Sequence, residues 1–236
     1  MEHDYAPSFP LQVQDVSFGL QQGTSTSTLI APGVAVKYKV PTNGNDDVNE
    51  GNNPNSWIGT MFPDASWTSG NTGIGYATGS PDAYDPLIST DVQGLMWGGG
   101  TSIYIRIPFN IADPSTISGL TLKMKYDDGF VAYLNGVEIG NLLKPAELAW
   151  DSATAGHAER SGGDPTVLHL PEILGLTLAR EHLRDGVNVI ALHGFNSDVN
   201  GSDFLVRPEL SVTRVVSSSP LVINDTQTIT ARAYRN

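Results

Sequence analysis

Short segments in which apolar side chains alternate with other residues recur along the chain, and they constrain its fold more than any other feature. In residues 34–40, Val34, Val36, Tyr38 and Val40 alternate with the remaining residues. This spacing is typical of a β-strand with one face in the core. The same analysis predicts further strands at residues 102–109, 121–126, 129–134, 187–192 and 204–212, with a return strand through Val137 and Ile139.

The segments between these strands are rich in turn-forming residues. The 236 residues include 25 Gly and 15 Pro, and 16% of residues are charged. Asn135-Gly136 favours a type I′ hairpin, because both central positions of that turn need a positive φ. One short helical segment is predicted at residues 171–184. Short strands joined by such turns predict an all-β fold, an antiparallel β-sandwich.

Charge and cysteine content narrow the function classes. Thirteen Lys and Arg against 25 Asp and Glu give a formal net charge of −12. An acidic surface repels phosphate backbones and anionic membranes, so we expect neutral ligands or divalent cations rather than nucleic acid. The chain has no cysteine, which excludes disulfides and thiolate metal sites. No apolar run reaches the roughly 18 residues of a membrane helix, so membrane insertion is not expected.

Two segments together resemble a known family. YDDGFVAYLNGVEIG at 126–140 is followed by LRDGVNVIALHGFN at 183–196, and FPDASWTSGNTGIGY at 62–76 fits the part before them. The set is similar to galactose-binding-like jelly-roll modules, including the sugar-binding domain of family 2 glycoside hydrolases. The resemblance implies a jelly-roll sandwich, with carbohydrate, a polysaccharide or glycan, as the ligand class. One scaffold of this kind serves many functions, so it does not by itself name a ligand.

The resemblance also implies an organisation. Residues 13–214 look like a module of large secreted bacterial proteins, which places the chain outside the cell or on its surface beside other domains of a longer polypeptide. Residues 1–12 read as an extended linker. Residues 215–236 begin with a Ser-rich linker, and their end resembles part of the C-terminal β module of chitobiases and hexosaminidases.

Asp127-Asp128-Gly129 is the sharpest local signal for chemistry. Adjacent carboxylates repel, and a bound Ca²⁺ would offset that repulsion. The triplet resembles the calcium-holding Asp-Asp-Gly of a family of adhesion domains, which implies that Asp127 and Asp128 are ligands, with Asn135 as a possible third group. The alternative is a turn in which Asp127 caps neighbouring backbone. The loop Asn43–Asn55 is a second calcium candidate, against the alternative of a solvated loop.

Aromatic side chains are the predicted sugar platforms, because their apolar faces stack on the C–H face of a pyranose. Trp97 precedes three glycines that would expose its ring, Trp150 lies in a polar loop, and Tyr84 stands beside Asp85. The alternative for these side chains is packing of loops onto the core. For Trp57 and Trp67 we predict a structural role.

Catalysis has little support in the sequence. There is no Gly-x-Ser-x-Gly elbow, P-loop or dinucleotide fingerprint, and the five histidines show no zinc spacing. We therefore expect a non-catalytic carbohydrate-binding module, with calcium assisting if it is bound. The competing hypothesis is a structural spacer or protein-adhesion module. A third, weaker one is a glycan esterase or lyase that would use His157 or His193.

Overall fold

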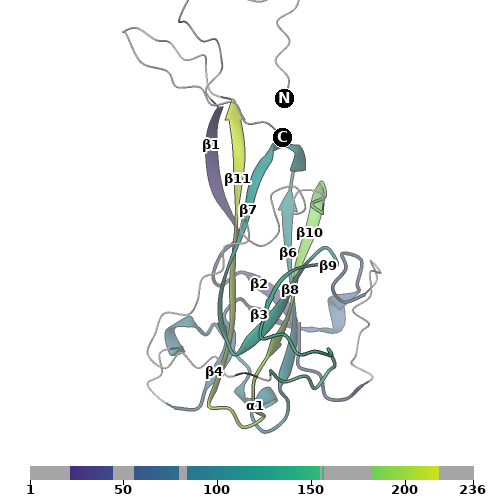
Figure 1. Cartoon of the computed structure of the whole chain (residues 1–236), viewed down its shortest axis with the longest axis vertical. Coiled ribbons are helices and arrows are strands. Elements are labelled where there is room, and N and C mark those ends of the chain that lie inside the picture. The colour runs from purple at the N-terminus through teal and green to yellow at the C-terminus, as the bar shows by residue number, and fades with distance from the viewer. Residues whose placement is uncertain (1–21, 45–55, 80–83, 155, 157–181, 218–236) are drawn as a thin grey trace, which may run out of the picture. The chain divides into compact units, whose positions relative to one another are not determined.

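The computed structural model describes residues 22–44, 56–79, 84–154, 156 and 182–217 (Figure 1). The chain divides into two compact units, residues 25–214 and a second unit of residues 1–24 with 215–236. Of the second unit, residues 22–24 and 215–217 are described. The predicted boundaries after residues 12 and 214 stay predictions, and the helix predicted at 171–184 lies almost wholly outside the described residues.

The described strands form two sheets. The six-stranded sheet has the order β3 (Thr68–Asn71), β2 (Ala35–Lys39), β6 (Ser102–Ile111), β10 (Gly186–Phe195), β8 (Gly129–Leu134), β9 (Val137–Leu142). The five-stranded sheet has the order β1 (Gln22–Ile30), β11 (Asp203–Ser217), β4 (Ile74–Ala77), β5 (Thr90–Asp91), with β7 (Ile117–Asp127) also paired to β11. Pairs with a described register are antiparallel, except the short parallel pair of β4 and β5. This arrangement confirms the predicted all-β sandwich.

Helical structure is slight in the described residues. It consists of the four-residue helix α1 (Gln93–Met96) and short 3-10 turns that include η2 (Asp64–Ser66) and η3 (Asp85–Leu87). The hairpin between β8 and β9 turns at Asn135 and Gly136, whose φ angles are 51° and 95°. Both values lie in the left-handed region that a type I′ turn requires, so the hairpin prediction is confirmed.

The main core lies between the two sheets. Ile103, Ile105 and Ile107 of β6 contribute to it from one sheet, and Leu122 and Met124 of β7 from the other. All five are at most 1% exposed. The alternation seen in the sequence therefore places one face of each strand in a shared interior, as the period of two in a strand requires.

The six-stranded sheet is buried on its second face as well. Tyr104 of β6 and Tyr133 of β8 belong to a separate apolar cluster with Trp57, Ile58 and other residues of the segment after position 55. Every side chain of β8 is buried. β2 keeps the half-buried pattern that the sequence predicts, whereas the central strands are covered on both faces because residues 56–67 lie over them.

Strand β1 was not predicted from the sequence. Its residues 24–28 are Thr, Ser, Thr, Ser and Thr, and all are exposed. This stretch has no apolar alternation to detect, because it gains its order by pairing with β11, and the strand reaches the core only at Ile30.

Candidate functional site

Trp97 lies at the end of the short helix α1, where the chain turns toward β6. Met96 of this helix is fully buried and anchors it to the core. Its neighbours Leu95 and Trp97 are 52% and 51% exposed. Gly98 has a φ of +73° and donates its backbone N–H to the carbonyl of Val199 at 2.7 Å. The helix end is thus fixed from both sides while the indole stays accessible.

Trp150 lies at the same end of the sandwich, although it is partly buried. The hydroxyl of Ser102 donates to the Trp150 carbonyl at 2.6 Å, and that of Thr101 donates to the Asp151 carbonyl at 3.0 Å. A Cβ on Gly44 would lie 3.5 Å from the indole Nε1 of Trp150. The Trp150 loop is therefore bound to the start of β6, directly after the glycines that follow Trp97.

Asp127 and Asp128 also lie at this end, but in the interior. They are 0% and 1% exposed and are joined by a cis peptide bond. Asp127 Oδ2 accepts the Tyr84 hydroxyl at 2.8 Å, and Asp128 Oδ2 accepts the backbone N–H of Ser197 at 2.7 Å. Tyr84 is only 3% exposed. The Tyr84 ring therefore has no exposed face on which a sugar could stack, in contrast to the predicted sugar platform. The ring is interior because its hydroxyl bonds the buried Asp127.

A buried phenol supports the loop between β10 and β11. Tyr76 donates its hydroxyl to the carbonyl of Gly201 at 3.0 Å and accepts from Asn196 Nδ2 at 2.8 Å. Burial raises the pKa of Tyr76 to about 12, the carboxylates of Asp203, Asp127 and Asp128 add to the rise, and the Asn196 hydrogen bond opposes it. The phenol therefore stays protonated at neutral pH and serves as a fixed donor.

Asn135 does not lie with these residues. Its Nδ2 donates to the carbonyl of His182 at 2.7 Å and to Asn188 Oδ1 at 2.8 Å, and its Oδ1 accepts the Val189 N–H at 2.9 Å. Strand β8 separates it from Asp128, a span of roughly 20 Å at 3.3 Å per residue. Asn135 therefore fastens the hairpin to β10 and cannot share a ligand with Asp127 and Asp128, contrary to the suggestion from the sequence.

The described residues offer few oxygen ligands for the predicted calcium ion. Among the residues that the structure describes, no cluster of three or more Asp, Glu, His or Cys side chains is placed to hold a metal. Two carboxylates alone fall short of the six to eight oxygen ligands that Ca²⁺ takes. Most of the loop Asn43–Asn55 lies outside the described residues. Calcium binding stays a prediction.

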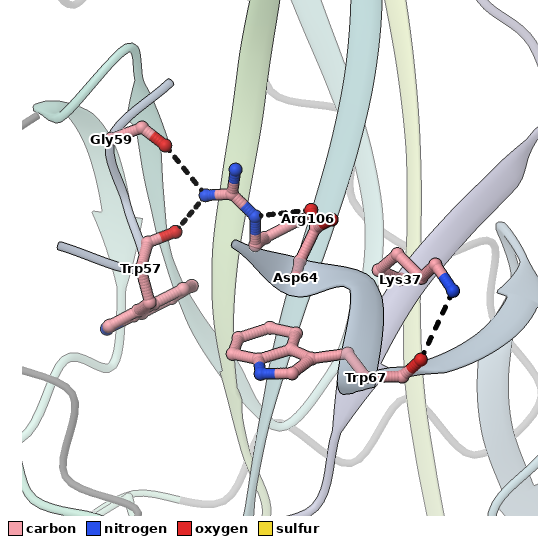
Figure 2. Close-up of polar contacts among 6 residues, drawn as sticks. All are labelled: Lys37, Trp57, Gly59, Asp64, Trp67 and Arg106. Atoms are coloured by element: carbon pink, nitrogen blue, oxygen red, sulfur yellow. Dashed lines mark hydrogen bonds and ion pairs between the residues drawn. The ribbon is translucent and has the colours of Figure 1, made fainter. Parts of the chain in front are cut away.

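A second group of residues, not found from the sequence as a functional unit, joins residues 56–67 to the sheet (Figure 2). Arg106 is 2% exposed, and its Nε lies 2.8 Å from Asp64 Oδ2. Its Nη1 donates to the carbonyls of Trp57 and Gly59. The Phe62 ring lies 5.3 Å from the guanidinium carbon. The alternation in β6 points position 106 away from the main core, where an Arg ordinarily indicates a solvent-exposed face, so the sequence carries no signal for this covered face.

Aromatic rings pack beside these contacts of Arg106. Trp57 is fully buried and Trp67 is 7% exposed, which confirms the structural role predicted for both. Trp57 and Tyr104 have ring centroids 4.7 Å apart, and His193 lies 4.6 Å from Tyr104 and 4.2 Å from Phe195. His193 is thus an interior residue of the aromatic layer. His157 lies outside the described residues.

The candidate site is therefore the end of the sandwich formed by residues 97–101, 148–152 and 196–201. It exposes Trp97, partly exposes Trp150, and encloses Tyr84, Asp127 and Asp128 beneath the loops. No helix in the described residues has the length and apolar character needed to cross a membrane.

Comparisons with known proteins give only distant similarities. No protein-family model matches the chain, and no curated protein matches it. Among solved structures, a β-glucuronidase of Bacteroides uniformis matches with a TM-score of 0.44 and 11% identity, over 80% of this chain and 18% of that one. A glycosyl hydrolase family 2 member from Bacteroides cellulosilyticus gives 0.41 and 13%, over 80% and 20%. The Ruminococcus gnavus β-glucuronidase gives 0.41 and 12%, over 88% and 30%. The chain spans less than a third of the length of these enzymes, and similarity at this level establishes no family.

Proposed function

We propose that the chain is a non-catalytic carbohydrate-binding module of a secreted or cell-surface multidomain protein. The observation that carries the proposal is the exposed indole of Trp97, whose backbone is held at one end of the sandwich between the buried Met96 and the hydrogen-bonded Gly98. A large aromatic ring offers much apolar contact area and has only two side-chain torsions to immobilise on binding.

The mechanism is stacking of a neutral sugar ring on this indole. Leu95, two residues before Trp97, is a second large apolar side chain exposed near this end of the sandwich. Trp150 lies on the neighbouring loop and provides a second ring. A single shallow platform binds weakly, and repetition of such modules in a longer polypeptide raises avidity.

The arrangement of Asp127 and Asp128 supports a non-catalytic role for this pair. Asp127 and Asp128 are adjacent in the chain and buried, and each accepts a hydrogen bond from a fixed donor. Glycoside hydrolysis instead uses two carboxyl groups set across a cleft from each other, about 5 to 9.5 Å apart.

Affinity electrophoresis against a panel of neutral polysaccharides tests the proposal. We expect at least one polysaccharide to retard the wild-type protein, and Trp97→Ala to weaken that binding at least roughly tenfold, the usual effect of removing an aromatic anchor. Met61→Ala is the matched control, because Met61 is 68% exposed elsewhere and its loss removes apolar surface without touching the platform. Equal retardation of wild type and Trp97→Ala, or none of the wild type on any polysaccharide, would contradict the proposal.

The same measurement with calcium or with a chelator separates the two parts of the hypothesis. If calcium assists binding, the chelator abolishes retardation and Asp127→Asn reproduces that loss. If the chelator changes nothing, sugar binding at Trp97 stands without calcium.

A structural spacer is the second candidate, and a specific observation favours it. Tyr84, Asp127 and Asp128, three of the predicted ligand-contacting residues, are interior, as that hypothesis expects. Tryptophan fluorescence that responds to neither sugars nor calcium would support the spacer.

A further inference from the structure

Strands β7 and β11 bring two cationic side chains face to face on the outer side of the five-stranded sheet. The strands lie side by side and antiparallel (Figure 1), and their register places Lys125 opposite Arg207 and Lys123 opposite Glu209. The burial of β7 alternates from Leu120 onward, with the lysines on the less buried face. Side chains directly opposite on neighbouring strands have Cβ atoms about 4.5–5.5 Å apart.

The two pairs differ in charge balance. Lys123 Nζ lies 3.6 Å from Glu209 Oε1, so this pair is neutral. The side chains of Lys125 and Arg207 have no hydrogen bond or ion pair within the described part of the chain. Like charges directly opposite each other destabilise a sheet. This arrangement stands out in a chain with 25 acidic and 13 basic residues, where an acidic neighbour would be the easier choice.

A pocket lies over the same residues. Its lining consists of Pro32, Lys123, Lys125, Arg207, Pro208 and Glu209. Three cationic side chains and one carboxylate leave this lining with a net charge of +2, and the two prolines give it stiff edges. The pocket therefore combines a concave shape with a local charge opposite in sign to that of the whole chain.

We infer that this pocket binds a small oxyanion, a carboxylate or sulfate group, between Lys125 and Arg207. A guanidinium presents paired donors to such a group, and a lysine adds a point charge. The net charge of −12 repels polyanions at longer range, so the ligand carries one anionic group. The site lies on a sheet face rather than at the Trp97 end and does not depend on the carbohydrate proposal.

An NMR titration of the ¹⁵N-labelled chain at constant ionic strength tests this inference, with sodium sulfate, glucose 6-sulfate and glucose as probes. We expect saturable shifts of the backbone amides of residues 123–125 and of 207 and 209 with the two sulfates, and none there with glucose. Tighter binding of glucose 6-sulfate than of sulfate identifies a sugar-borne group, whereas equal binding identifies the free anion. Each result supports an oxyanion site.

Variants locate the site. Lys125→Gln and Arg207→Gln should each weaken sulfate binding about tenfold, because each removes a charge-assisted contact. Lys144→Gln removes one positive charge elsewhere, from a pair with Glu138 at 2.7 Å, and should bind sulfate like the wild type. The inference would be overturned if sulfate produced no saturable shifts in the wild type, or if all variants bound sulfate with equal affinity. The wild-type titration tests the inference even if a variant does not fold.

Discussion

Among single side chains, Arg106 joins the six-stranded sheet to the segment that covers it. We predict that Arg106→Leu lowers the free energy of unfolding by about 2–4 kcal/mol, because it leaves two carbonyls and Asp64 without their buried cationic partner. Lys37→Leu is the comparison, since Lys37 bonds the Trp67 carbonyl from a partly exposed position and should cost less than about 1 kcal/mol. Urea unfolding measures both, and equal losses would contradict a special role for Arg106.

The Tyr76 phenol provides a prediction about pH. Its pKa in the folded protein, about 12, lies above the ordinary value of 10.0, so the folded state holds the proton more tightly than the unfolded state. The resulting stability is fully present below about pH 10 and is lost as the pH rises toward 12. Tyr76→Phe leaves the Gly201 carbonyl and Asn196 Nδ2 without their bond to the phenol, so it should be less stable than the wild type at neutral pH, and the difference should shrink in that window. Unfolding titrations of both proteins between pH 7 and 12 test this, and a constant difference would refute it.

Single residues also show where sequence reasoning about the site ends. Exposure of Trp97 was expected from the glycines that follow it, and these do hold the chain in a turn. Burial of Asp127 and Asp128 was not evident, because a carboxylate pair looks the same in a sequence whether its partners are a cation or the Tyr84 hydroxyl and a backbone N–H. Those partners lie 43 and 69 positions away in the chain.

At the scale of strands, alternation in the sequence predicted the elements that pack on the core. The strand at 102–111 and the return strand at 137–142 follow it, whereas 129–134 and 189–192 are continuous apolar runs, which are typical of strands buried on both faces. Two features could not be predicted in this way. Strand β1 is exposed along residues 24–28 and buries Ile30 only at its end, and the second covered face depends on residues 56–67 folding over the sheet, a contact that no local pattern records.

The pairing of β4 with β11 depends on the absence of a side chain at Gly75. A Cβ there would lie 2.2 Å from the backbone oxygen of Phe204, and backbone cannot move aside as a flexible side chain can. Gly75→Ala should destabilise the protein by about 1–3 kcal/mol, the usual cost of overpacking. Gly79→Ala is the control, because a Cβ at Gly79 would contact nothing within 4 Å. Thermal unfolding compares them, and similar melting temperatures would contradict the prediction.

At the scale of the whole molecule, the two sheets differ in what they leave accessible. The six-stranded sheet has the main core on one face and the aromatic layer on the other. The five-stranded sheet keeps an outer face with charged side chains on β7 and β11. Ligands can therefore reach the described unit at its loop ends or on the outer face of the five-stranded sheet, which is where both proposals place them.

Burial of β6 on both faces has a consequence for which amino-acid substitutions the strand tolerates. A strand with one solvent-exposed face accepts polar substitutions at every second position, and β7 should show that alternation. Along Ile103–Ile107 we expect no such alternation. A polar substitution that faces the aromatic layer should destabilise the protein as much as one that faces the sandwich interior. A library of all single substitutions in both strands, sorted for folded protein, tests this. Tolerance to substitution should alternate along β7 and should be uniformly low along Ile103–Ile107 of β6.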